Sequence, residues 1–160
     1  DNIALFCDPS GIDVEDLFDD VLAFGAKLLV VDSLQLCCLQ GKKGDIGQPA
    51  MMDAVVNMIS SFVQEKKRTA IIISHINKVG DYAGTEKVKH LVDGLVRLDY
   101  NSSEYNEEGK PVGPAGGVRK IYMSGKSRQG RADITSLIEI TDKGMRPPSM
   151  KALRALSKLV

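Results

Sequence analysis

Short apolar runs alternate along the chain with segments in which apolar residues recur every three or four positions. Two of the runs are unbroken, at residues 28–31 and 69–74, and each is followed by polar residues. Unbroken runs of this length are typical of strands buried on both faces of a parallel sheet. Shorter apolar runs predict further strands at residues 2–6 and 95–98.

Helical spacing appears in the segments that separate these strands. One amphipathic segment has acidic residues in its first turn, and a second lies between the two unbroken runs. A short helical segment ends near Asp93, and the last predicted helix covers 149–160. The apolar positions of the first two helices are Val14, Leu17, Phe18, Val21 and Leu22, and Met52, Val55, Val56, Ile59 and Phe62.

The order of these elements predicts the fold class. Strands and helices alternate through the first two thirds of the chain, as in a parallel sheet. A polar, glycine- and proline-rich connection at 101–117 then precedes two strands at 118–124 and 133–140, which are predicted to be antiparallel. We therefore expect an α/β protein with a mainly parallel sheet flanked by helices and an antiparallel C-terminal edge.

Composition narrows the possible functions only slightly. The 160 residues carry 21 Lys+Arg and 21 Asp+Glu, so no overall basic field indicates nucleic acid, although basic residues confined to loops remain compatible with DNA binding. No apolar run approaches about 18 residues and no secretory signal is visible, so we expect a cytoplasmic protein without a membrane partner. The first residue is Asp, which suggests a fragment or a processed chain.

The three cysteines are predicted to have a packing role. Cys7, Cys37 and Cys38 form no CxxC pair and the chain has two histidines, so a zinc site is not expected. Cys7 and Cys37 are interpreted as small apolar residues at strand ends in a reducing compartment.

The polar residues after the two unbroken strands are the first candidates for chemistry. In an open parallel sheet, ligands bind beyond the carboxyl ends of the strands. Asp32 is suited to ordering Mg²⁺ and its water beside a nucleotide, and His75 on the neighbouring strand is suited to sensing a γ-phosphate. The alternatives are a carboxylate that caps the next turn and a histidine that is hydrogen-bonded without a ligand.

Three stretches resemble RecA-type ATPases of the RadA/Sms branch. Residues 28–35 (LLVVDSLQ) resemble the Walker B strand, and residues 71–99 resemble the following strand, second DNA loop, helix and strand. Residues 125–130 (GKSRQG) resemble the signature Lys-Asn-Arg-Phe-Gly, with Ser127 and Gln129 as departures. Thr85-Glu86 also replaces the usual Pro-Arg, which suggests a divergent and phage-borne relative. The resemblance implies that 1–146 is the C-terminal part of a RecA-like core and that 147–160 is a basic helix or tail.

The resemblance also implies roles for individual residues. ATP and Mg²⁺ would be the cofactors, with Asp32 holding Mg²⁺ through water, Ser33 supporting Asp32 and His75 sensing the γ-phosphate. Lys126 and Arg128 would reach the nucleotide of a neighbouring subunit in a hexameric ring or filament, the role of an arginine finger. The alternative for both is an ordinary solvated charge at the end of a strand.

Two polar loops, at 40–49 and 77–85, correspond to the DNA-facing loops of such assemblies. Lys42, Lys43 and Lys78 would contact the phosphates of single-stranded DNA. Because Asp45 and Asp81 offset these charges, flexible surface loops remain an open alternative.

No phosphate-binding loop is present in these residues. Gly125-Lys126-Ser127 has the ending of the pattern G-x-x-x-x-G-K-[ST], but the first glycine would have to stand where Lys120 lies. The chain alone is therefore expected to bind nucleotide poorly and to be inactive, with the loop supplied by another segment. The resemblance implies that the chain is part of an ATP-driven motor that acts on single-stranded DNA in recombination and repair. The alternatives are that it is part of a DnaB-type replicative helicase core or a non-catalytic RecA-like subunit.

Overall fold

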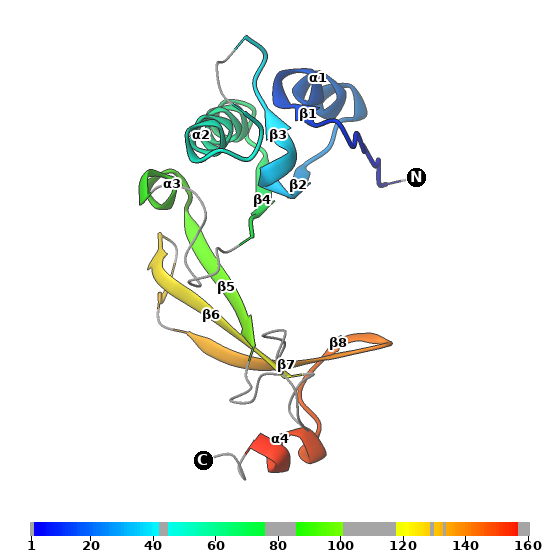
Figure 1. Ribbon diagram of the computed structural model, residues 1–160, viewed down its shortest axis with the longest axis vertical. Helices are drawn as coiled ribbons and strands as arrows, with labels where there is room; N and C mark the ends of the chain where they lie inside the picture. The colour runs from blue at the N-terminus through cyan, green and yellow to red at the C-terminus, as the bar shows by residue number, and fades with distance from the viewer. Residues whose placement is uncertain are drawn as a thin grey trace. The chain divides into compact units, whose positions relative to one another are not determined.

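A computed structural model describes residues 2–41, 45–75, 86–100, 118–128, 130–132 and 134–156. The chain divides into two compact units, Asp1–Val92 and Asp93–Val160 (Figure 1). The predicted limits of the RecA-like core, 1–146, and of the basic tail, 147–160, remain predictions.

The first unit combines helices with two pairs of parallel strands. β2 pairs with β4 in parallel, and the two-residue strands β1 and β3 form a second parallel pair. The elements in chain order are β1 (Ile12–Asp13), α1 (Val14–Phe24), β2 (Leu28–Asp32), the 3-10 helix η1 (Leu34–Leu36), β3 (Cys37–Cys38), α2 (Pro49–Glu65), β4 (Thr69–Ile73) and α3 (Glu86–Leu91).

Local signals set the ends of α1. The Asp13 carboxylate accepts a hydrogen bond from the Glu15 backbone N–H at 2.8 Å, which caps the N-terminus. At the other end Gly25 has φ +73°, and its N–H donates to the Leu22 carbonyl at 3.0 Å. This left-handed conformation is accessible to glycine at little cost, so the helix stops there and the chain turns into β2.

The second helix brings Arg68 back to the end of α1. Arg68 follows α2, and its Nη1 donates to the Gly25 carbonyl at 3.2 Å and also to the Ala26 carbonyl. The guanidinium therefore provides hydrogen-bond donors to two carbonyls of the turn that directly follows α1. This contact joins the two turns that lead into the parallel strands β2 and β4.

The core of the first unit lies on one face of the β2–β4 pair. Leu29 and Val31 are 8% and 6% exposed, whereas Leu28 and Val30 are 49% and 54% exposed. The rings of Phe18 and Phe62 stack with centroids 3.9 Å apart. The buried cluster consists of Val14, Leu17, Val21, Leu29, Val31, Leu34, Cys37, Met51, Met52, Val55, Val56, Ile59, Phe62 and Val88.

The prediction that both central strands are buried on two faces is therefore wrong for this chain. Ile71 and Ile73 of β4 are 51% and 40% exposed, on the same pattern as β2. α2 packs against β4 and α1 on the buried side of the pair. An unbroken apolar run predicts apolar neighbours on both sides of a strand, and within the first unit the side chains on only one side of each strand are buried.

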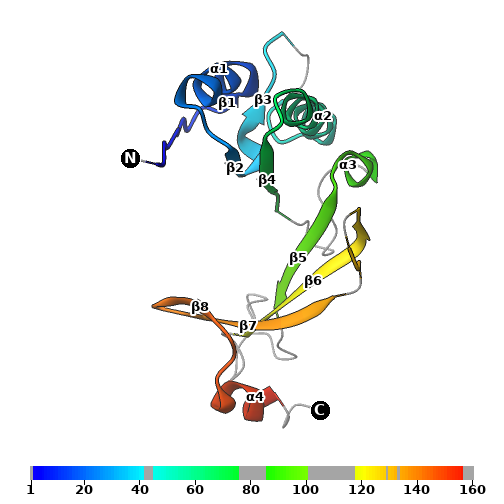
Figure 2. The same ribbon diagram turned by 180° about the vertical axis from the view of Figure 1, so that it is seen from behind.

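The predicted strand at 2–6 is also not observed. Residues 2–8 form neither helix nor strand, as the irregular ribbon next to the N label shows (Figure 2). Ile3 and Leu5 are 85% and 90% exposed. A strand requires a neighbour for its backbone hydrogen bonds, and β2 pairs only with β4 in the part of the chain that is described. Cys7 is consequently exposed, contrary to the prediction, whereas Cys37 is buried in β3 as predicted.

The second unit is an antiparallel sheet followed by a helix. The strand order β5-β6-β7-β8 confirms the predicted antiparallel C-terminal region. The connection at 101–117 lies outside the described residues. The elements are β5 (Gly94–Tyr100), β6 (Val118–Ser127), β7 (Thr135–Thr141), β8 (Gly144–Arg146) and α4 (Met150–Leu156).

Glu139 connects β7 to β8 and to the start of α4. Its carboxylate accepts from Arg146 Nε at 3.2 Å and from the Ser149 backbone N–H at 2.9 Å. Ser149 in turn caps α4, because its Oγ accepts from the Ala152 N–H at 3.2 Å. In the part of the chain that the structure describes, no helix combines the length and the apolar character needed to cross a membrane.

Candidate functional site

Asp32 and His75 lie at the same edge of the first unit. β2 and β4 run in parallel, and Asp32 at the end of β2 pairs with Ile73 at the end of β4. His75 follows β4 two residues later, and both Asp32 and His75 are exposed. Parallel pairing thus brings these two predicted site residues to the carboxyl ends of neighbouring strands, where open sheets bind ligands.

Gln35 joins the two strand ends. Its side chain extends from η1, where Nε2 donates to Ser74 Oγ at 2.9 Å and Oε1 accepts from the His75 backbone N–H at 3.4 Å. Ser74 Oγ also lies 3.4 Å from the His75 carbonyl, to which it donates. Sequence reasoning did not single out Gln35, and its only signal was its place at the end of LLVVDSLQ.

Ser33 is buried beneath this edge. It is 7% exposed, and its carbonyl accepts from the Leu36 N–H at 3.0 Å and from Cys37 Sγ at 3.9 Å. Among the described residues no hydrogen bond connects the Ser33 side chain to Asp32. The predicted support of Asp32 by Ser33 remains a prediction, and the observed contacts of Ser33 instead hold the turn around η1.

The two neighbouring cysteines are unreactive by environment. Burial raises the pKa of the Cys37 thiol to about 11, and the adjacent Cys38 thiol adds to the shift. Burial also raises the pKa of Cys38, with a smaller contribution from the Asp13 carboxylate. Both thiols are therefore protonated at neutral pH and are weak nucleophiles, in keeping with a packing role.

Lys126 and Arg128 belong to the second unit, at the end of β6. Lys126 lies within the strand and Arg128 directly follows it. Arg128 Nη1 lies 2.8 Å from Asp93 Oδ1, and the Arg128 N–H donates to the Asp93 carbonyl at 2.9 Å. Gly125-Lys126-Ser127 is thus part of a strand and not of a phosphate-binding loop, which confirms that the sequence pattern there is a decoy.

The predicted DNA contacts cannot be placed in the fold. Lys42, Lys43 and Lys78 lie outside the described residues, as does the whole loop at 77–85. Asp45, within the first loop at 40–49, is described and exposed.

The residues at the strand ends suit magnesium bound through water. Asp32 is an exposed carboxylate, and no ion pair engages it within the described ranges. In the same ranges no group of three or more His, Cys, Asp and Glu side chains is placed to enclose a metal directly. Mg²⁺ beside a nucleotide usually keeps several waters and binds one or two carboxylates and the phosphates. One carboxylate at this edge is therefore enough to provide the ligand that the protein contributes.

Comparison with known proteins identifies the family. The sequence profile described as "ATPase: KaiC" matches residues 13–146, which include the described strands β2 to β8 and the second residue of β1. The chain belongs to the KaiC family of RecA-type ATPases. The predicted RecA-type fold and the resemblance to RadA are thereby confirmed, and the family in general uses nucleotide and Mg²⁺.

Individual relatives of this KaiC-family chain are distant. It is 27% identical to the DNA repair protein RadA of Aquifex aeolicus over 118 residues, which are 74% of this chain and 24% of that protein. It is 24% identical to the RadA of Escherichia coli over 132 residues, 82% of this chain and 26% of that protein. The chain therefore spans about a quarter of the length of these curated relatives.

A solved structure supports the fold independently. A KaiC-like protein from Pyrococcus horikoshii superposes with a TM-score of 0.56 at 19% identity, covering 85% of this chain and 53% of the other. At that identity the similarity concerns the fold alone. The KaiC-family architecture of this chain is therefore supported both by sequence and by backbone geometry.

Proposed function

We propose that this chain is part of a RadA-like, DNA-dependent ATPase that moves on single-stranded DNA during recombination or repair in the cytoplasm. The observation that carries the proposal is the pairing of β2 with β4, which brings Asp32 and His75 to one strand edge, where Gln35 bonds the Ser74 and His75 segment. An acidic residue and a hydrogen-bonding residue on neighbouring strands are the parts that a nucleotide-dependent switch requires.

The proposed roles at this edge follow from the side chains. Asp32 holds Mg²⁺ through water, and Ser33 keeps the turn behind it in place. His75 detects the γ-phosphate, and its backbone link to Gln35 carries the loss of that phosphate into η1 and the loop that follows. Magnesium-bound ATP would supply the transferable phosphoryl group. The chain's own residues would orient this group and form hydrogen bonds around it.

Two further parts complete the proposal. Lys126 and Arg128 reach the nucleotide of a neighbouring copy in a ring or filament and stabilise the charge of the phosphoryl group during transfer. Cationic residues supplied in this way contribute about 10³- to 10⁵-fold in rate. Lys42, Lys43 and Lys78 contact DNA phosphates, so the affinity for DNA falls as salt rises.

The test is ATP hydrolysis by the natural polypeptide that carries these residues, with and without single-stranded DNA. Asp32→Asn is expected to reduce DNA-stimulated hydrolysis at least about 100-fold, because the carboxylate charge that orders Mg²⁺ is lost. Asp20→Asn, the same change on the exposed side of α1, serves as the matched control.

A parallel pair of variants tests the assignment in the second unit. Lys126→Ala is expected to abolish DNA-stimulated hydrolysis, whereas Lys143→Ala, at an exposed position in the turn before β8, is expected to leave it intact. Hydrolysis that survives Lys126→Ala would show that the role assigned to Lys126 is wrong.

A second candidate function is a non-catalytic RecA-like subunit that joins a motor assembly. It differs from the first candidate in requiring that the whole natural polypeptide have no G-x-x-x-x-G-K-[ST] loop to bind the phosphates of ATP. The same assay distinguishes the two: a natural polypeptide that joins an assembly and binds DNA, but never hydrolyses ATP, supports the second candidate and contradicts the first.

A further inference from the structure

Three consecutive links join the start of β5 to the end of β6. Gly94 pairs with Ser127 in the antiparallel ladder. One residue outward, the Arg128 N–H donates to the Asp93 carbonyl at 2.9 Å, and Arg128 Nη1 donates to Asp93 Oδ1 at 2.8 Å. Asp93 thus holds Arg128 by its backbone and by its guanidinium at the same time.

A bulge lies immediately inside these links. From Gly94 to Val96 β5 advances by two residues, whereas its partners on β6 run from Ser127 to Met123, a step of four. Extra residues on one strand bend it and re-aim its side chains, and such bulges are common beside functional sites. A side chain just beyond a bulge needs a separate anchor to keep one orientation, and Asp93 supplies one for Arg128.

The exposure of the pair indicates that folding stability is not its main contribution. The side chains of Arg128 and Asp93 are 51% and 68% exposed. Ion pairs with this much solvent access contribute little to stability, because water screens both charges and two side chains lose their freedom. The ion pair contributes more by fixing the orientation of the guanidinium. A guanidinium has five donors in a fixed plane, so a carboxylate that binds one nitrogen also sets the direction of the other donors.

We propose that Asp93 is the positioning residue of Arg128. It acts through Arg128 and does not touch the nucleotide: its carboxylate sets the orientation in which the guanidinium meets the phosphates of the neighbouring copy. The inference rests on the proposed role of Arg128 in hydrolysis and adds a residue that this role requires.

The experiment measures kcat and KM for ATP in the natural polypeptide with single-stranded DNA. Asp93→Ala is expected to lower kcat about 10- to 100-fold, the loss typical of a misplaced catalytic group, while KM changes less than about twofold. Asp93→Glu is expected to recover most of the rate, because a carboxylate again faces the guanidinium. Arg146→Ala removes a similar ion pair at β8, on the other edge of the same sheet, and is expected to leave kcat unchanged.

A double variant separates positioning from general structural damage. In an Arg128→Ala background, Asp93→Ala is expected to cause no further loss, because there is no guanidinium left to orient. Asp93→Asn keeps the size of the side chain and one acceptor, so it provides a second measurement if Asp93→Ala does not fold.

The outcomes distinguish this inference from the proposed function. If Arg128→Ala reduces hydrolysis but Asp93→Ala matches or exceeds the wild type, Asp93 does not position Arg128, and only this inference is wrong. Additive losses in the double variant also overturn it. If Arg128→Ala hydrolyses ATP at the full rate, the proposed role of Arg128 is wrong and the role of Asp93 falls with it.

Discussion

Different interactions stabilise the interior of each of the two units. In the first unit helices cover one face of β2 and β4, and fourteen apolar side chains form one buried cluster. In the second unit, among the side chains that the structure describes, only the apolar residues Val118 and Ala152 reach comparable burial. Side-chain packing therefore stabilises the first unit, whereas backbone pairing and polar contacts account for more of the order in the second.

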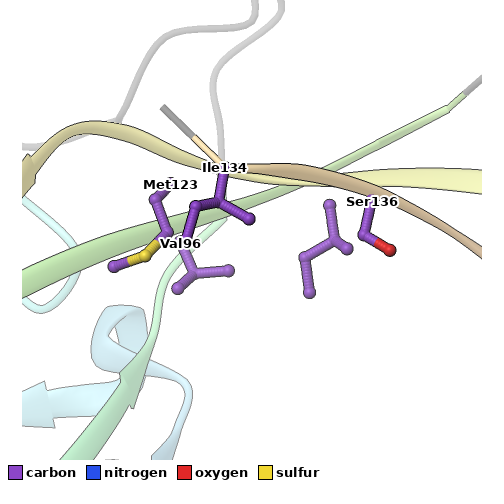
Figure 3. Close-up of a pocket in the computed structure, with 5 residues that line it drawn as sticks. Val96, Met123, Ile134 and Ser136 are labelled. Carbon is purple, nitrogen blue, oxygen red and sulfur yellow. The ribbon is translucent and has the colours of Figure 1, made fainter. Parts of the chain in front are cut away.

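Exposed apolar side chains occur in both units, on the open face of β2 and β4 and on the antiparallel sheet. A shallow hollow of about 190 Å³ on the sheet of the second unit is lined by Val96, Ile121, Met123, Ile134 and Ser136 (Figure 3). Val96 and Ile134 are 58% and 50% exposed, so this face of the sheet has apolar side chains without a covering layer among the described residues. None of the described residues that line this hollow is charged, and we assign it no chemistry.

The candidate residues of the two units are also held differently. Ser74 and His75 are linked to Gln35 by neutral hydrogen bonds, of which the one to Ser74 is partly buried and the one to His75 is exposed. Arg128 is held by an exposed ion pair. Salt screens the attraction between two charges much more than a neutral hydrogen bond, so the geometry around Arg128 should respond to ionic strength and that around His75 should not.

The largest effect expected from this comparison is the loss of core packing in the first unit. Ile59, on α2, is 1% exposed, and Ile59→Ala should lower the free energy of unfolding by about 2–5 kcal/mol, because methyl groups are lost and a cavity remains. Ile140→Ala, at a position 39% exposed in β7, should cost less than about 1 kcal/mol. Urea unfolding measures both, and equal losses would contradict the contrast between the units.

A smaller effect tests the one-sided burial of β2. Val31→Ala should cost about 2 kcal/mol, since the side chain is 6% exposed within the core. Val30→Ala makes the same change on the open face, where the side chain is 54% exposed, and should cost less than half as much. A large loss at Val30 in the natural polypeptide would show that another segment covers this face.

Loss of the hydrogen bonds from Gln35 should lower the free energy of unfolding still less, but it should increase local opening of the backbone at His75. Gln35→Leu removes two hydrogen bonds and should cost about 1–2 kcal/mol. Hydrogen exchange at the His75 amide should accelerate, because its acceptor is gone. Gln64→Ala, on an exposed position of α2, is the control and should leave exchange at His75 unchanged.

The smallest predicted effect concerns pH and the second unit. The backbone N–H of Ser149 and the side chain of Arg146 hold the pKa of Glu139 below its usual value of 4.5. A carboxyl whose pKa is lowered in the folded state stabilises the fold above its unfolded pKa, and this contribution is lost as the pH falls through the folded value. The β7–β8–α4 region should therefore loosen below about pH 4.5, as followed by NMR, and Glu139→Gln should flatten this dependence.

The helices and the order of strands were predictable because their signals are local. The spacing of Val14, Leu17 and Val21 predicts the buried side of α1, and Asp13 and Gly25 mark its ends. The positions of the candidate residues Asp32 and His75 were predictable for the same reason, since Asp32 directly follows an apolar run and His75 follows another after Ser74. The predicted strand at 2–6 failed because its formation depends on a neighbouring strand, which local pattern does not reveal.

The sequence alone determined the positions of α1, α2 and the main strands, the KaiC-family character of the chain and the lack of a phosphate-loop pattern in its 160 residues. These properties depend on residue type and spacing along the chain. Only the tertiary structure decided that β2 and β4 are covered on one face, that Gln35 reaches Ser74 and His75, and that Asp93 holds Arg128. Each of these depends on residues 35 to 40 positions apart or on which neighbours cover a strand. Contacts of this kind arise from how elements pack together, and hydrophobic periodicity contains no information about them.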